Sequence, residues 1–125
     1  MNDIITYDQL LYAFEHDDIF SIDETAIYFT DEDESRDVHF IGCLRQYDKP
    51  YWAGLCDIPN GTDFATAEEL FTAKIYDGLS IKDRWDKAVV EQIGGLPTVD
   101  WLYIYVEKLK SHMLKERKQG NENNS

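Results

Sequence analysis

VHFIGCLRQYDKPYWAGLCD, residues 38–57, is the stretch that decides the fold. Its two ends are rich in β-branched and aromatic residues, and a polar YDKP turn separates them. This pattern predicts two antiparallel strands joined by a hairpin. With Asp48 and Lys49 at the tip, the pairing places Cys43 and Trp52 on the same face of the hairpin. Both faces are largely apolar, so we expect helices to cover one face and the other to be at least partly covered.

Two further segments have strand composition. Residues 25–30 precede the hairpin and complete an N-terminal meander, and residues 88–93 supply a fourth strand. Gly94-Gly95 follows that strand and is typical of a hairpin or strand-to-helix turn. The predicted fold class is therefore α+β, with a small antiparallel sheet of about four strands.

Capping signals predict two short helices. Thr6 and Gln9 have the spacing of a capping box at the start of a helix over residues 6–16. A second box, TAEE, opens a helix over residues 66–77, which Gly78 is placed to end. We expect both helices to pack around the sheet.

The longest predicted element is a C-terminal helix that Pro97 and Thr98 introduce, and we expect it to pack on one face of the sheet. Its apolar residues recur at intervals of three and four, which is the pattern of an amphipathic helix. The stripe consists of Val99, Leu102, Val106, Leu109 and Met113. The length suits one domain, which we place at residues 1–118, with a disordered polar tail at 119–125.

Charge is the most distinctive bulk property of the chain. Lysine and arginine total 12 and acidic residues total 25, which gives a formal net charge of −13. Residues 1–40 hold twelve acids and one base, whereas residues 41–125 hold thirteen acids and eleven bases. This balance argues against direct binding of nucleic acids or anionic membranes, and it favours a basic protein as partner.

Cellular location is predicted from what the sequence lacks. Two cysteines are too few for a disulfide framework. No run approaches the roughly 20 apolar residues of a membrane span. The N-terminus lacks the pattern of a secretory signal. We therefore expect a cytoplasmic protein with free thiols.

The acidic turn begins like a calcium-binding loop. Asp31, Asp33 and Ser35 occupy the first, third and fifth positions. The sixth position, where such loops need glycine, is Arg36, and the twelfth, where they need glutamate, is Gly42. An acidic hairpin turn is the favoured interpretation.

Neither the cysteines nor the histidines form a catalytic pattern. His39 and Cys43 share a strand face but are four residues apart, about 13 Å along a strand, too far for a nucleophile–base pair. Cys43 and Cys56 have neither redox nor zinc spacing, so buried free thiols are favoured over a disulfide. The sequence predicts no catalytic residue, cofactor or metal site.

The favoured function is therefore a non-enzymatic interaction module that binds and blocks a basic partner. Small inhibitors, immunity proteins and mobile-element proteins have this size and charge. A mimic of DNA is a less favoured variant, because the acids cluster in turns. We expect the partner to contact the N-terminal acids and the aromatic residues of the hairpin, namely Glu15, Asp17, Asp18, Asp31, Glu32, Asp33, Glu34, Tyr47 and Trp52.

Two alternatives stay open. One is a small enzyme or ligand-binding domain with a cleft between sheet and helices, using His39, Cys43, Trp52 or Asp57. The other is a homodimer, in which the acidic N-terminal region of one copy meets the basic end of the last helix of another.

Overall fold

The computed structural model describes residues 4–31, 38–54, 62–76 and 78–123, with the backbone alone for Thr62 and for residues 117–123. Its core is an antiparallel sheet of six strands in the order β4-β3-β2-β1-β5-β6. The strands are β1 (Thr25–Phe29), β2 (His39–Cys43), β3 (Tyr51–Ala53), β4 (Thr62–Phe64), β5 (Ala88–Ile93) and β6 (Leu96–Pro97). The α+β class and the meander are confirmed. The two extra strands, β4 and β6, are too short to carry a recognisable alternation.

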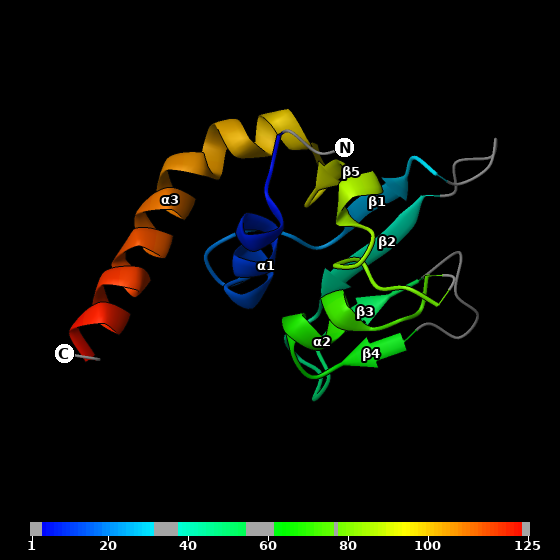
Figure 1. The fold of residues 1–125 in the computed structure, drawn as a ribbon, viewed down its shortest axis with the longest axis horizontal. Helices are drawn as coiled ribbons and strands as arrows, with labels where there is room; N and C mark the ends of the chain where they lie inside the picture. The colour runs from blue at the N-terminus through cyan, green and yellow to red at the C-terminus, as the bar shows by residue number, and fades with distance from the viewer. Residues whose placement is uncertain (1–3, 32–37, 55–61, 77, 124–125) are drawn as a thin grey trace.

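In the ranges that the structure describes, three α-helices accompany the sheet (Figure 1). They are α1 (Tyr7–Glu15), α2 (Ala67–Thr72) and α3 (Thr98–Asn123), and a short 3-10 helix, η1 (Trp85–Lys87), precedes β5. Among the described helices, none has both the length and the apolar composition that a membrane span requires. α3 includes residues 119–123, which belong to the expected polar tail. The domain boundary at residue 118 stays a prediction.

Both predicted capping residues are confirmed. The Thr6 hydroxyl accepts a hydrogen bond from the Gln9 backbone at 3.1 Å, and the Gln9 side chain accepts one from the Thr6 backbone. Thr66 caps α2 in the same way, although the Glu69 carboxylate accepts from Ala65 rather than from the cap residue.

The predicted end of α2 is wrong. The helix stops at Thr72 because the backbone at Ala73 is extended, with ψ at 129°. Gly78 belongs to a separate tight turn, in which the backbones of Tyr76 and Leu79 exchange two hydrogen bonds. Its φ of 80° is left-handed, which glycine adopts without strain, so it serves this turn and does not end the helix.

The predicted register of the central hairpin is also wrong. Gly42 pairs with Trp52, and Cys43 pairs with Tyr51, so the connection runs from Leu44 to Pro50 instead of turning at a two-residue tip. Pro50 has no N–H group, and its carbonyl alone bonds to Leu44, at 2.7 Å. The observed pairing differs from the predicted one by an odd number of residues. Because side chains alternate between the faces of a strand, this difference moves Trp52 to the face opposite Cys43.

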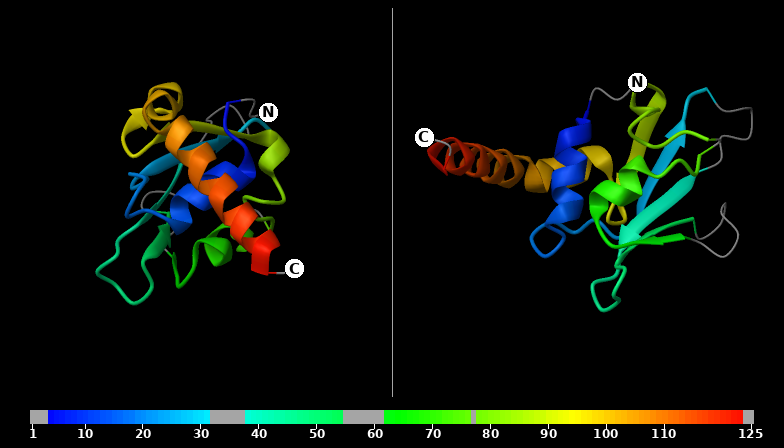
Figure 2. Two further views of the ribbon diagram at one scale, coloured as in Figure 1. Left: turned by 90° about the vertical axis from the view of Figure 1, so that its left-hand side faces the viewer. Right: turned by 60° about the horizontal axis from the view of Figure 1, so that its bottom comes forward.

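The helices form layers on one face of the sheet (Figure 2). α1 and α2 lie against the sheet, and α3 contacts β5 and β6 as well as α1, with Glu116 in its C-terminal half pairing with His16 at the end of α1. The C-terminal half of α3 extends away from the sheet on the far side of α1. The core between these layers is filled by large, fully buried side chains, among them Phe14, Phe20, Phe29, Phe71 and Trp101.

One partly buried hydrogen bond joins α3 to the chain that enters the sheet. The Trp101 indole N–H donates to the Ser21 carbonyl at 2.8 Å. Gly94 lies against the same carbonyl, where a side chain would overlap it. Gly94 and Gly95 have φ values of 58° and 83°, which confirms the predicted tight turn and makes it the hairpin between β5 and β6.

We predict that Trp101→Phe lowers the free energy of unfolding by about 1–3 kcal/mol, because it leaves the Ser21 carbonyl without the donor of a partly buried hydrogen bond. The matched control is Tyr105→Phe, which removes a longer, exposed contact to the Ser21 hydroxyl (3.5 Å) and should cost less than about 0.5 kcal/mol. Urea denaturation followed by far-UV circular dichroism measures both. Equal losses would contradict the role given to the Trp101 bond.

Candidate functional site

The face of the sheet opposite the helices carries Trp52. Its indole lies across Gly42 on the neighbouring strand, where an added Cβ would be 2.6 Å from Trp52 Cζ2. The absence of a side chain at Gly42 therefore lets the ring lie flat on the sheet. Trp52 is 8% exposed and forms a floor on this face.

Asp23 holds that floor in place. Its Oδ1 atom accepts a hydrogen bond from the Trp52 indole N–H at 2.8 Å and another from the Cys43 backbone N–H at 3.0 Å. The carboxylate joins β2 to β3 from the segment that leads into β1. Because its ring nitrogen is bonded, the orientation of Trp52 is fixed before any ligand arrives.

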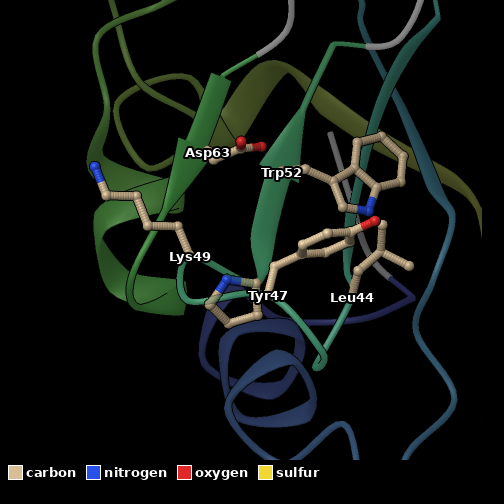
Figure 3. A pocket seen from close by; sticks show the side chains of 6 residues that line it. Leu44, Tyr47, Lys49, Trp52 and Asp63 are labelled. Carbon is tan, nitrogen blue, oxygen red and sulfur yellow. The ribbon is translucent and has the colours of Figure 1, made fainter.

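A pocket of roughly 180 Å³ opens beside Trp52 (Figure 3). Tyr47, in the β2–β3 connection, is 60% exposed, and its ring lies close to Trp52 and Leu44. The Asp63 carboxylate extends from β4 toward Trp52, whereas the Lys49 ammonium group points away from both rings. The lining residues are Leu44, Tyr47, Lys49, Pro50, Trp52 and Asp63.

Two of the predicted partner-binding acids lie at the same end of the sheet as the pocket. Arg45 follows Leu44 in the β2–β3 connection and forms ion pairs with Asp17 at 2.9 Å and with Asp18 at 3.7 Å. One guanidinium group thus links the turn after α1 to this connection. It balances one of the two negative charges.

Glu15 faces a different part of the molecule. Desolvation by burial raises its pKa, while the His16 side chain lowers it and the negative charges of Glu116 and Glu68 raise it further. The Glu15 carboxylate is thus close to acids of α2 and α3. It does not line the Trp52 pocket.

Asp31 lies at the opposite end of the sheet, beyond the end of β1. It accepts a hydrogen bond from Arg84 Nη2 at 2.6 Å, and this bond holds the Asp31 pKa below its usual value. The Arg84 guanidinium is buried over the Phe29 ring, with its carbon 3.9 Å from the ring centre. Asp31 is therefore half of a structural ion pair.

The predicted acids consequently do not gather on one face. Those that the structure describes divide between Asp17 and Asp18 near the pocket, Glu15 near α3, and Asp31 at the far end. Glu32, Asp33 and Glu34 lie outside the described residues, as does most of the calcium-like motif. Within the described ranges, no group of three or more His, Cys, Asp or Glu side chains is arranged to hold a metal ion.

The residues proposed for a cleft between sheet and helices do not converge. Cys43 faces the core, and burial, the largest of several causes, raises the pKa of its thiol to about 12. His39 lies between the rings of Phe29 (5.2 Å) and Tyr76 (5.0 Å). Trp52 lies on the other face, and Asp57, like Cys56, is outside the described residues.

Sequence reasoning missed Asp23 and Asp63. Asp63 belongs to β4, a three-residue strand that is too short to be recognised from its sequence. Asp23 looks like any other acid of the N-terminal region, and only the register of β2 and β3 reveals its two bonds. Tyr47 and Trp52, which were predicted, do lie together in the pocket.

No family model, curated protein or solved structure matches this chain. Function is therefore inferred from the geometry of the site.

We predict that Cys43 does not react with an aromatic disulfide reagent in the folded protein, because its thiol is buried and stays protonated at neutral pH. A Cys56→Ser background isolates its reaction. Thiolate release, followed by absorbance, should track unfolding as urea is raised. Fast modification in the absence of urea would contradict this prediction.

The Asp31–Arg84 pair predicts a specific dependence of stability on pH. A carboxyl group whose pKa is lowered by folding contributes stability above its unfolded value, about 4, and loses it as pH falls through the folded value. Asp31→Asn should therefore be less stable than the parent protein at neutral pH and approach it in acid. Urea midpoints measured between pH 7 and pH 3 test this, and a constant difference over that range would contradict it.

Proposed function

We propose that this protein is a non-enzymatic interaction module that binds a basic protein, in the manner of a small inhibitor or immunity protein. The observation that carries the proposal is the pocket of Tyr47, Trp52 and Asp63 on the sheet face opposite the helices. Large aromatic side chains in a pocket are the residue types that dominate binding energy at protein interfaces.

The chemistry of the pocket suits a cationic side chain. Aromatic faces attract ammonium and guanidinium groups, and a carboxylate adds a charge-assisted hydrogen bond. Asp63 supplies that carboxylate beside the rings, while Lys49 contributes its aliphatic stem and directs its charge away (Figure 3). A lysine or arginine of the partner would therefore be the anchor.

The charges around the pocket support the same partner. Asp17, Asp18, Asp48 and Asp63 lie at this end of the sheet, whereas the bases there are Arg45 and Lys49. The remaining excess of negative charge would attract a basic surface and speed its association at low salt. The hydrogen bond that the Trp52 indole donates to Asp23 fixes the floor in advance, which reduces the entropy lost on binding.

Pocket size favours a protein side chain over a metabolite. The volume of roughly 180 Å³ is below the range of about 300–1,000 Å³ that is usual for small-molecule sites. It is large enough for the end of one long side chain. The alternative of a small enzyme lacks a comparable observation among the described residues.

A titration with a short peptide of alternating arginine and glycine tests the proposal. We expect the indole N–H signal of Trp52 to shift in ¹⁵N–¹H NMR spectra, and Asp63→Asn to weaken binding about tenfold, because it removes the charged acceptor. Tyr47→Ser should have a similar effect. The probe is the peptide itself, so no natural partner has to be known.

Asp86→Asn is the matched control, since it makes the same charge change at an exposed residue of η1, which does not line the pocket. It should alter affinity less than about twofold. If Asp63→Asn and Asp86→Asn weaken binding equally, the peptide is attracted by net charge alone and the proposed site is wrong. If the indole N–H signal of Trp52 does not shift on addition of the peptide, the proposed site is also wrong.

A further inference from the structure

β4 is one edge of the sheet, beside the pocket of Trp52. The strand order begins β4-β3, and among the described residues no other strand pairs with the outer side of β4. The opposite edge, β6, has only two residues, and one of them, Pro97, has no N–H group to donate. A strand edge offers its backbone groups to an extended chain, which is a common way of binding a peptide. β4 is therefore the edge that can accept a further strand.

Hydrogen bonds between β2 and β3 show which way the neighbouring backbones point. The Leu44 N–H donates to the Pro50 carbonyl at 2.7 Å. The Gly54 N–H donates to the Phe40 carbonyl at 2.9 Å. Bonded pairs recur at every second residue of an antiparallel ladder, so Trp52, midway between Pro50 and Gly54, has its backbone groups on the β2 side. The residues on either side of it in β3 therefore have theirs on the β4 side.

The same alternation turns the backbone of Asp63 outward. Phe64 and Thr62 pair with the two β3 residues that flank Trp52, so their N–H and C=O groups point toward β3. Asp63 lies between them, and its N–H and C=O groups point to the outer side of β4. The next outward-facing residue is Ala65, and its N–H donates to the Glu69 carboxylate at 3.3 Å, which agrees with this geometry.

Asp63 can therefore contact one partner residue in two ways. Its carboxylate lines the pocket beside Trp52, while its backbone faces the open edge (Figure 3). A residue that pairs with Asp63 in an antiparallel strand would lie about 5.5 Å away between Cα atoms, with its side chain on the same face of the sheet. An arginine or lysine at that position would extend past the carboxylate toward the rings of Trp52 and Tyr47.

We propose that the basic partner binds as an extended segment that adds an antiparallel strand to the β4 edge, with an arginine or lysine opposite Asp63. This inference rests on the proposed function and specifies how the partner presents its anchor. The anchor residue exchanges two backbone hydrogen bonds with Asp63, and its side chain enters the pocket. Backbone pairing supplies affinity, and the pocket supplies selection for a cation.

Charge favours a basic segment over a second copy of this chain. Two copies of β4 paired about their central residues would place one Asp63 carboxylate directly opposite the other, and like charges in that position destabilise a sheet. Glu69, bonded to Ala65 just beyond β4, adds a second negative charge at the edge. Lys49, which lines the pocket, offsets one of the two. The edge therefore repels itself and attracts a cationic chain.

A pentapeptide with the sequence Thr-Val-Arg-Val-Thr, blocked at both ends, tests the proposal with the full chain. N-methylation of the arginine removes the N–H that would donate to the Asp63 carbonyl, and it should weaken binding at least about tenfold. The matched control is N-methylation of the valine after the arginine, because that N–H would point away from β4. It should change the affinity less than about twofold. Both affinities are measured by NMR titration of the Trp52 indole N–H signal.

Hydrogen exchange of the Asp63 backbone amide gives an independent measurement. At saturating peptide this amide should exchange at least about tenfold more slowly, because it donates to the arginine carbonyl. Equal losses from the two N-methylated peptides, or an Asp63 amide that gains no protection, would overturn strand addition. If the peptide still shifts the Trp52 signal in that case, the proposed function stands. A larger loss from the methylated valine would overturn the antiparallel arrangement, and a Trp52 signal that does not move would overturn both proposals.

Discussion

Three successive residues between α1 and β1 hold the layers of this protein together. The Ser21 carbonyl accepts the indole N–H of Trp101, and the Ile22 carbonyl accepts the Thr25 hydroxyl at 2.6 Å. Asp23 then bonds to both β2 and β3 through one carboxylate oxygen. The Ser21 backbone bonds to α3 on the helical side of the sheet, and the Asp23 side chain bonds to β2 and to Trp52 on the other side. Neither side can therefore shift without straining a hydrogen bond that is costly to leave unmade.

The candidate binding site depends on that segment. Trp52 would otherwise be one aromatic ring on a half-covered sheet, free to rotate about its side-chain bonds. The Asp23 bond and the flat surface at Gly42 select a single orientation, which leaves space for the pocket between Tyr47 and Asp63. Rigidity of this kind belongs to the fold and costs nothing at the moment of binding. The same argument explains why an acid outside the pocket lining controls its shape.

The sequence predicts the parts of this fold that depend on neighbours along the chain. Thr6 and Thr66 cap helices through residues three positions away, and Gly94-Gly95 makes its turn locally, so these signals are reliable. The hairpin register was missed because the prediction placed a two-residue turn at Asp48-Lys49. Pro50 has no N–H group to donate, and it contributes only its carbonyl, which accepts from Leu44. In the site, Tyr47 and Trp52 could be predicted from residue type, whereas Asp23 and Asp63 gain meaning only from contacts across strands.

Folding also pairs several of the acidic residues with arginines. Residues 1–40 are strongly acidic, yet Asp17 and Asp18 share Arg45, and Asp31 pairs with Arg84 across 53 positions of sequence. These pairs use acids to position loops, so the net charge of −13 overstates the charge that a partner meets at any one place. A buried arginine such as Arg84 needs its carboxylate, because an uncompensated charge in the interior is strongly destabilising. In the proposed function, recognition would therefore depend on the few carboxylates near the aromatic pocket, chiefly Asp63, rather than on the acidity of the whole chain.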